Sequence, residues 1–332
     1  MSKIKISILV PVYNAERYIE RCVCSLFEQT YTNIEFVFVN DNTHDKSIDI
    51  LKNILERYPV RKSQTKIINH SENLGVAVAR NTLLDNATGD YVLWVDADDF
   101  IKKNTVEILV SKVETTRADI VCFNTAWYTE LKGAKIMPEN KALTPYDFIQ
   151  DVLNCKISPV LWGRLFKLSL FRKYDIKFIK GLNMGEDMLV LLKVVYYSEI
   201  LVNEKSVLYY QEVGNSDSLS RSYSPESIDT TLKVLDRIDQ FFADKFDISS
   251  GLKIRKLELF IRKLHQICIS NDKKSFISLK KQALALKYEG VKLRKRSLYD
   301  VYLFCDNYVL CRIYSLFLKL VRHLKDKFKI RY

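Results

Sequence analysis

The hydrophobic residues of the first 125 positions fall into short runs that alternate with stretches of helical spacing. Each run is bounded by polar or turn-forming residues, as the strands of a buried sheet are. The predicted strands are 4–10, 34–39, 66–69, 91–95 and 119–123. The predicted helices are one capped by Asn14, then 45–58, 76–86 and 104–114. This alternation predicts an α/β fold with a mostly parallel sheet covered by helices.

The pattern changes twice further along the chain. From about 125 to 220 it is mixed and loop-rich, and after Pro225 no proline occurs, which predicts helices to the end. We therefore expect two regions, an α/β domain over 1–220 and a helical region over 221–332.

The last predicted helix, about 299–326, carries its polar residues on one narrow stripe and is apolar elsewhere. A helix with so wide an apolar face either packs in a core or lies in a membrane interface. Periodicity alone leaves both open, with the helix at 252–269 as the core partner. The stripe consists of Arg312, Ser315, Lys319, Arg322, His323 and Asp326.

Charge adds to this picture because it is unevenly distributed. The chain has a net charge of +12, but residues 1–130 hold 15 Lys and Arg against 18 Asp and Glu. Residues 287–332 hold 12 Lys and Arg against 4 Asp and Glu. Anionic lipid attracts such basic clusters by about 1 kcal/mol per residue. The charge therefore favours docking of the last helix on an anionic membrane surface, with a helical partner surface as the alternative.

Several classes of protein are excluded. The seven cysteines form no CxxC pair and the four histidines are scattered, so no zinc site is predicted. The sequence contains no GxGxxG, GxxxxGK[ST] or GxSxG motif, which argues against dinucleotide redox chemistry, P-loop phosphoryl transfer and serine hydrolysis. No signal peptide and no apolar run of ~18 residues are visible, so we expect a cytoplasmic protein, peripheral on the inner face of the cell membrane if the last helix docks there.

Three carboxylates, Asp96, Asp98 and Asp99, follow a predicted buried strand. Carboxylates this close repel one another, and a bound divalent cation relieves that repulsion. Oxygen ligands suit Mn²⁺ or Mg²⁺. The alternative is an Asp-rich loop that caps the helix near 104.

Three other polar segments, 11–14, 40–45 and 73–81, also follow predicted strands. Singly, each is explained as a turn or a helix cap. The carboxyl ends of parallel strands meet at one edge of a sheet, where ligands bind. We therefore expect the four segments to form one site.

These segments resemble the motifs of the family 2 glycosyltransferases, the inverting GT-A group. They read PVYN at 11–14, VNDNTHD at 39–45, NLGVAVARN at 73–81 and DADD at 96–99. The resemblance implies a GT-A catalytic domain over 1–220, and a UDP-sugar donor. Asn40, Asn42 and Thr43 depart from the family's usual residues but keep polar turn chemistry.

The resemblance also implies roles for individual residues. Pro11, Val12 and Tyr13 line the uracil and ribose pocket, and Asp41 hydrogen-bonds the base. Arg80 helps to hold the nucleotide. Asp96, with its neighbour Ala97, contacts the nucleotide sugar, and Asp98 binds the metal that bridges the diphosphate. These assignments are those of the family's motifs at matching positions of this sequence.

Three later segments match the family more loosely. GED at 185–187 resembles the motif that supplies the catalytic base, which implies Asp187 as base and Glu186 as an acceptor-binding or supporting group. An attacking hydroxyl must lose its proton, and a carboxylate can accept it. In isolation the same two acids are explained as residues of a helix N-terminus.

WGRLF at 162–166 is either a buried aromatic turn or a substrate contact. YYQ at 209–211 matches the end of the catalytic domain.

The sequence thus predicts a metal-dependent inverting glycosyltransferase acting on a saccharide or lipid-linked saccharide in cell-surface polysaccharide synthesis. Two alternatives remain. A sugar-phosphate nucleotidyltransferase would need a basic Gly-rich loop that residues 10–20 lack. A non-catalytic nucleotide- or membrane-binding protein would need no catalytic base. Nucleic acid is not an expected partner, because the Asp cluster repels phosphates.

Overall fold

In the computed structural model, residues 3–137, 144–215, 224–286, 302, 305 and 307–327 are described. The chain divides into two compact units. Unit 1 comprises Met1–Ile149 and Ile157–Arg221, and unit 2 comprises Gln150–Lys156 and Ser222–Tyr332.

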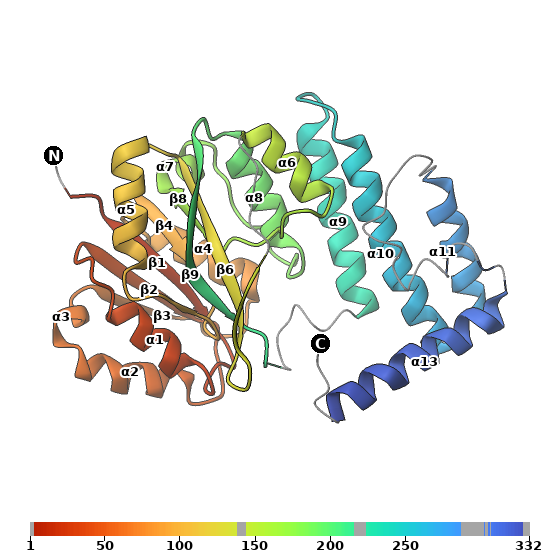
Figure 1. Ribbon diagram of the computed structural model, residues 1–332, viewed down its shortest axis with the longest axis horizontal. Helices are drawn as coiled ribbons and strands as arrows, with labels where there is room; N and C mark the ends of the chain where they lie inside the picture. The colour runs from red at the N-terminus through yellow and green to blue at the C-terminus, as the bar shows by residue number, and fades with distance from the viewer. Residues whose placement is uncertain are drawn as a thin grey trace. The chain divides into compact units, whose positions relative to one another are not determined.

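Unit 1 is built around one mixed sheet with the strand order β3-β2-β1-β4-β8-β6-β9-β5, and β7 pairs with β6 (Figure 1). The strands are β1 Ile6–Val12, β2 Ile34–Asn40, β3 Thr65–Asn69, β4 Tyr91–Trp94, β5 Phe100–Ile101, β6 Ile120–Thr129, β7 Gly133–Ile136, β8 Arg164–Lys167 and β9 Leu201–Glu212. β3, β2, β1 and β4 are parallel, β8 is antiparallel to both β4 and β6, and β9 is parallel to β6. The expected α/β fold with a mostly parallel sheet is confirmed.

Helices cover both faces of the parallel half of the sheet. The helices are α1 Ile19–Phe27, α2 Ser47–Arg57, α3 Pro59–Lys62, α4 Val76–Asn86, α5 Thr105–Thr116, α6 Pro145–Leu153, α7 Leu168–Lys173 and α8 Glu186–Tyr196. Ile8 and Val10 share one buried cluster with α1, α2 and α5. Leu9, between them, faces the other way because side chains alternate along a strand; it is fully buried, and α4 contacts β1 and β2. Burial on both faces explains why these strands are continuous apolar runs.

The predicted element bounds in the first 116 residues agree with the structure within about two residues, and the helix 76–86 agrees at both ends. The strand predicted at 119–123 is longer than expected, because β6 continues to Thr129. The capping role expected of Asn14 is wrong. α1 begins only at Ile19, after Tyr18, and no side chain caps it. Asn14 instead has φ +50°, and its backbone N–H donates to Thr43 Oγ1 at 2.9 Å. The Asn therefore shapes the loop before the helix, since Asn tolerates the left-handed region.

In the described part of unit 2 the regular elements are helical, as expected. They are the end of α6, then α9 Pro225–Phe242, α10 Ser249–Ser270, α11 Lys273–Ala285 and α13 Tyr308–Lys327. The last predicted helix is confirmed over 308–326, whereas most of 299–306 lies outside the described residues. α13 packs on α10 and α11 through Tyr308 and Cys311, which belong to their buried cluster. None of the described helices is both long and apolar enough to cross a membrane.

Candidate active site

The four motifs follow the carboxyl ends of the four parallel strands, as expected. Strand β1 ends at Val12, whose carbonyl accepts the backbone N–H of Asp41 at 3.0 Å. The Val12 side chain is fully buried in the core, so only its backbone is available to a ligand. Ala97 is buried in the same cluster. Tyr13, by contrast, is 46% exposed and free to contact a ligand.

Asp41 ties the loop after β2 to the loop after β3. Its carboxylate accepts the backbone N–H groups of Leu74 at 2.9 Å and Gly75 at 2.8 Å. It also lies 2.7 Å from Nδ1 of His70, whose Nε2 is 3.0 Å from Thr82 Oγ1. Three of about four acceptor positions of the carboxylate are thus occupied. Sequence reasoning missed His70, although its place directly after β3 was a usable signal.

Asn40 has a structural reason to depart from the family's usual acid. Its amide group donates to Asn69 Oδ1 at 2.9 Å, and its Oδ1 accepts the backbone N–H of Thr43 at 2.9 Å. An aspartate at this position could accept the N–H of Thr43 but has no N–H to donate to Asn69 Oδ1. Asn40 therefore links the ends of β2 and β3 through both halves of its amide.

Arg80 collects three carboxylates from distant parts of the chain. Its Nη1 donates to Glu186 Oε1 at 2.6 Å and to Asp187 Oδ1, and its Nη2 lies 3.5 Å from Asp96 Oδ1. α4 supplies the arginine, the loop after β4 supplies Asp96, and the first turn of α8 supplies the other two acids. We call these four residues the Arg80 cluster. The guanidinium expected to hold the nucleotide is thus bound to the expected base and to Asp96.

The environment of Asp187 suits a proton acceptor. Burial raises its pKa to about 7, with Glu186 and Asp96 acting in the same direction and Arg80 opposing them. Its side chain remains 14% exposed. A base works best when its pKa is near the working pH. The N-cap of α8 is Gly185, with φ +79°, so neither acid caps that helix.

The other two acids of the DADD segment have different surroundings. Asp99 is buried and accepts the Tyr209 hydroxyl at 2.5 Å and the backbone N–H of Glu212 at 2.7 Å. Asp98 accepts the amide of Asn215 at 2.9 Å. Burial and the neighbouring Asp96 raise the pKa of Asp98 to about 6. Asp99 therefore fastens this loop to β9 and does not cap the helix at 105, whose N-cap residue is Asn104.

Arg21 supports the same loop, although it belongs to none of the motifs recognised in the sequence. It forms an ion pair with the buried Glu212 at 2.8 Å and donates to the backbone carbonyl of Asp98 at 3.2 Å. Its guanidinium lies 4.6 Å from the centre of the Phe100 ring. These contacts fix the backbone beside the Asp98 side chain.

The WGRLF segment is packed into unit 1. The Trp162 ring stacks on the Tyr209 ring with centroids 5.1 Å apart. Arg164 is buried and donates to the backbone carbonyls of Ser158 at 3.1 Å and Trp162 at 3.3 Å. These contacts favour the buried aromatic turn over the alternative of a substrate contact.

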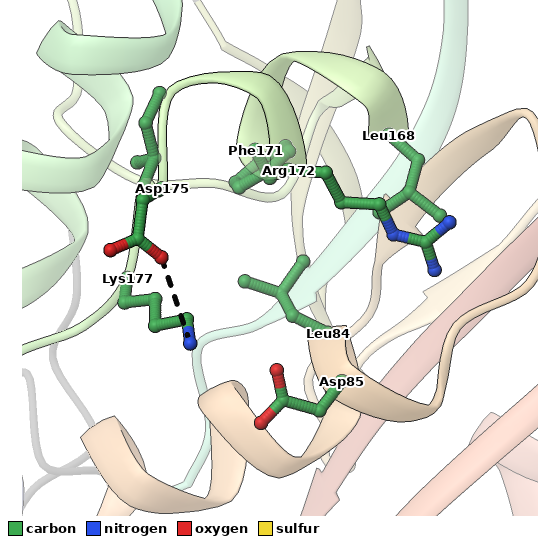
Figure 2. Close-up of a pocket in the computed structure, with 8 residues that line it drawn as sticks. Leu84, Asp85, Leu168, Phe171, Arg172, Asp175 and Lys177 are labelled. Atoms are coloured by element: carbon green, nitrogen blue, oxygen red, sulfur yellow. Dashed lines mark ion pairs between the residues drawn. The ribbon is translucent and has the colours of Figure 1, made fainter.

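A hollow of about 260 Å³ lies elsewhere on unit 1, between the end of α4 and α7 (Figure 2). Its charged rim includes Asp175 and Lys177, which pair with each other at 3.6 Å. It contains none of the predicted site residues, and its two paired charges are largely exposed. We therefore place the candidate active site at the four motifs and the Arg80 cluster, not at this hollow.

Comparison with known proteins finds a matching family model and related sequences. The model of Glycosyl transferase family 2 matches residues 7–177. Glycosyltransferase GlyA of Streptococcus pneumoniae is 30% identical over 285 residues, which span 82% of this chain and 39% of GlyA. The match thus covers less than half the length of that relative.

Solved structures show the same fold. Staphylococcus aureus TarS 1-349, in complex with UDP-GlcNAc, superposes with a TM-score of 0.67 over 96% of this chain and 92% of that one, at 20% identity. The mannosyltransferase PcManGT of Pyrobaculum calidifontis, in complex with GDP-Man and Mn²⁺, gives 0.55 over 94% and 87%, at 18% identity. These similarities confirm the expected GT-A fold with its C-terminal helical region.

Proposed function

The chain belongs to glycosyl transferase family 2, and we propose that it is a metal-dependent inverting enzyme that uses a UDP-sugar. The acceptor we propose is a hydroxyl of a saccharide or lipid-linked saccharide in cell-surface polysaccharide synthesis. Residues 1–220 would be the catalytic domain and 221–332 a helical appendage. The family match and the GT-A fold favour this function over a nucleotidyltransferase or a binding protein without activity.

One observation carries the proposal. Asp187 and Asp96 lie 91 positions apart in the sequence, yet one guanidinium, that of Arg80, contacts both. In the proposed site Asp96 belongs to the donor side and Asp187 to the acceptor side. The shared arginine would therefore hold the base at a fixed place relative to the donor, which is the positioning that a two-substrate reaction needs.

The proposed reaction is a single displacement. The acceptor oxygen forms a bond to the anomeric carbon of the donor while the bond from that carbon to the diphosphate oxygen breaks. The hydroxyl proton passes to the Asp187 carboxylate, whose pKa of about 7 lets it accept a proton near neutral pH. Arg80 keeps that carboxylate oriented and offsets part of the charge of the three acids.

The residues present fit a divalent cation. Asp98 is half-buried and accepts a neutral amide, that of Asn215. Burial and the neighbouring Asp96 raise the pKa of Asp98, and a bound cation would offset that unfavourable charge. Within the described residues, no three His, Cys, Asp or Glu side chains form a ready metal site. Mg²⁺ and Mn²⁺ often take one or two carboxylates and complete their shell with substrate phosphates and water. Asp98, with Asp96 beside it, would hold the cation, which would offset charge on the departing diphosphate.

A donor panel tests the proposal. The full chain is incubated with UDP-GlcNAc, UDP-glucose, UDP-galactose and GDP-mannose, each with Mn²⁺ and with EDTA, and released nucleotide is measured by chromatography. We expect release of UDP from one UDP-sugar, lost in EDTA. GDP release alone would replace the proposed donor class, and release that is unchanged by EDTA would contradict the metal dependence.

A further inference from the structure

Helix α13 exposes a row of large apolar side chains. They are between 44% and 60% exposed, whereas Leu257 and Leu264 of α10 are fully buried. We call them the apolar face of α13: Val309, Leu310, Ile313, Leu316 and Phe317. The spacing of one, three and four residues places them on one side of the helix.

The opposite side of α13 accounts for its packing. Cys311 and Ser315 are fully buried, and Ser315 Oγ lies 2.7 Å from the hydroxyl of Tyr302. That hydroxyl lies 2.6 Å from Nδ1 of His265 in α10. Figure 1 shows α13 crossing the ends of α10 and α11. In the part of unit 2 that the structure describes, packing thus uses a narrow side of α13 and leaves the apolar face uncovered.

Basic residues border the apolar face. At 3.6 residues per turn, Arg312 and Lys319 lie between the exposed apolar residues and the buried side of the helix, and Lys319 is exposed. The segment 287–332 carries 12 basic against 4 acidic residues. An apolar face bordered by Lys and Arg is the composition that binds the interface of an anionic bilayer.

We propose that the apolar face of α13 docks on an anionic lipid surface, with Ile313 and Phe317 inserted among the acyl chains. Arg312 and Lys319, at one border of this face, would lie at the lipid headgroups. A second copy of this chain is a poorer occupant, because pairing two such faces would bring together two segments with the same excess of positive charge. This inference goes beyond the proposed function, because it needs neither a donor nor catalysis.

Flotation with vesicles tests the proposal on the full chain without any nucleotide. One set of vesicles contains equal parts of phosphatidylcholine and phosphatidylglycerol, and the other contains phosphatidylcholine alone. We expect binding to the mixed vesicles that is at least about fivefold stronger than binding to phosphatidylcholine, since each basic residue near the surface contributes about that factor. Raising the salt from about 0.1 M to about 1 M should remove most of this preference.

Variants then test the apolar face. Ile313→Glu with Phe317→Glu should weaken binding to mixed vesicles by more than about tenfold, because two apolar side chains no longer enter the bilayer. Lys319→Gln should weaken it by up to about fivefold. The matched control is Ile277→Glu with Leu284→Glu, which alters two residues of α11 that are 57% and 43% exposed and should leave binding unchanged.

Three results would overturn the proposal. They are equal binding to the two vesicle types, unchanged binding by the double variant of α13, and a concentration-dependent dimer that this variant abolishes. The comparison of the two vesicle types uses the unaltered chain, so it can overturn the proposal even if a variant fails to fold. Neither readout depends on transfer activity, so failure here leaves the proposed enzyme untouched.

Discussion

Asp96 and Asp98 lie two residues apart in the DADD segment, but their side chains have different partners. Asp96 belongs to the Arg80 cluster, where three carboxylates share one buried guanidinium. Asp98 accepts a neutral amide, and burial with Asp96 raises its pKa. The acids of the Arg80 cluster are thus paired with a cation of the chain itself, the Arg80 guanidinium. Asp98, by contrast, is suited to a bound divalent metal ion. The role of a carboxylate in this motif is therefore set by the groups that it contacts, not by its position in the motif.

The largest expected effect is the loss of transfer when the proposed base, Asp187, is replaced. Asp187→Asn keeps the size of the side chain but removes the proton acceptor, so transfer should fall by about 10²–10⁴-fold. UDP affinity should stay within about threefold, because the change lies on the acceptor side of the Arg80 cluster. Rates at saturating donor, together with UDP titration, measure both. Normal turnover would remove Asp187 from the role of base.

Removal of the Arg80 guanidinium should lower the free energy of unfolding. Arg80→Met leaves three carboxylates without their shared partner, and loss of one member of a buried ion pair costs about 3–5 kcal/mol. Arg80→Lys keeps the charge and is the matched control, with a smaller loss. Urea unfolding of both variants measures the free energy. Equal losses in the two variants would mean that geometry, not charge, holds the Arg80 cluster together.

The link between the DADD loop and β9 should show an intermediate effect. Tyr209→Phe removes the hydroxyl that donates to Asp99 at 2.5 Å, and leaving a buried acceptor without its donor costs about 1–3 kcal/mol. Tyr210→Phe, which keeps the ring stacked on Phe100 with centroids 4.8 Å apart, is the control. Thermal unfolding compares them. Similar losses would contradict the structural role given to Asp99.

The raised pKa of Asp187 also predicts a pH dependence of the free energy of unfolding. The folded chain holds the pKa of Asp187 at about 7, above the unfolded value of about 4. The folded state thus binds more protons, so the stabilisation from this group is full below about pH 4 and is lost as pH rises through about 7. The urea midpoint of the wild type should therefore fall over this range relative to that of Asp187→Asn. A constant difference between the two would contradict the raised pKa.

Much of the fold and part of the site could be predicted from sequence. The four motifs meet because parallel strands end at one edge, a consequence of strand order that hydrophobic runs reveal. The contact of Arg80 with Asp187 could not be derived in this way, since 106 residues separate them and the antiparallel β8 intervenes. The resemblance named both residues without pairing them.

Local chemistry explains what was wrong or missed. Asn14 follows an apolar run and precedes a helical pattern, so it has the sequence signature of an N-cap, but its left-handed φ places it in the preceding loop. Ser315 belongs to the polar stripe of the last helix, yet it is buried and contacts the hydroxyl of Tyr302. In both cases a hydrogen-bond partner distant in sequence overrides the local pattern.

The comparison between the two acid groups is tested most directly by UDP binding with and without Mn²⁺. The shift in melting temperature caused by UDP follows the affinity of the folded state. We predict a Mn²⁺-dependent shift in the wild type, the same shift in Asp187→Asn, and no metal-dependent shift in Asp98→Asn. A shift of equal size in EDTA, or a metal-dependent shift retained by Asp98→Asn, would contradict the assignment of the added cation to Asp98.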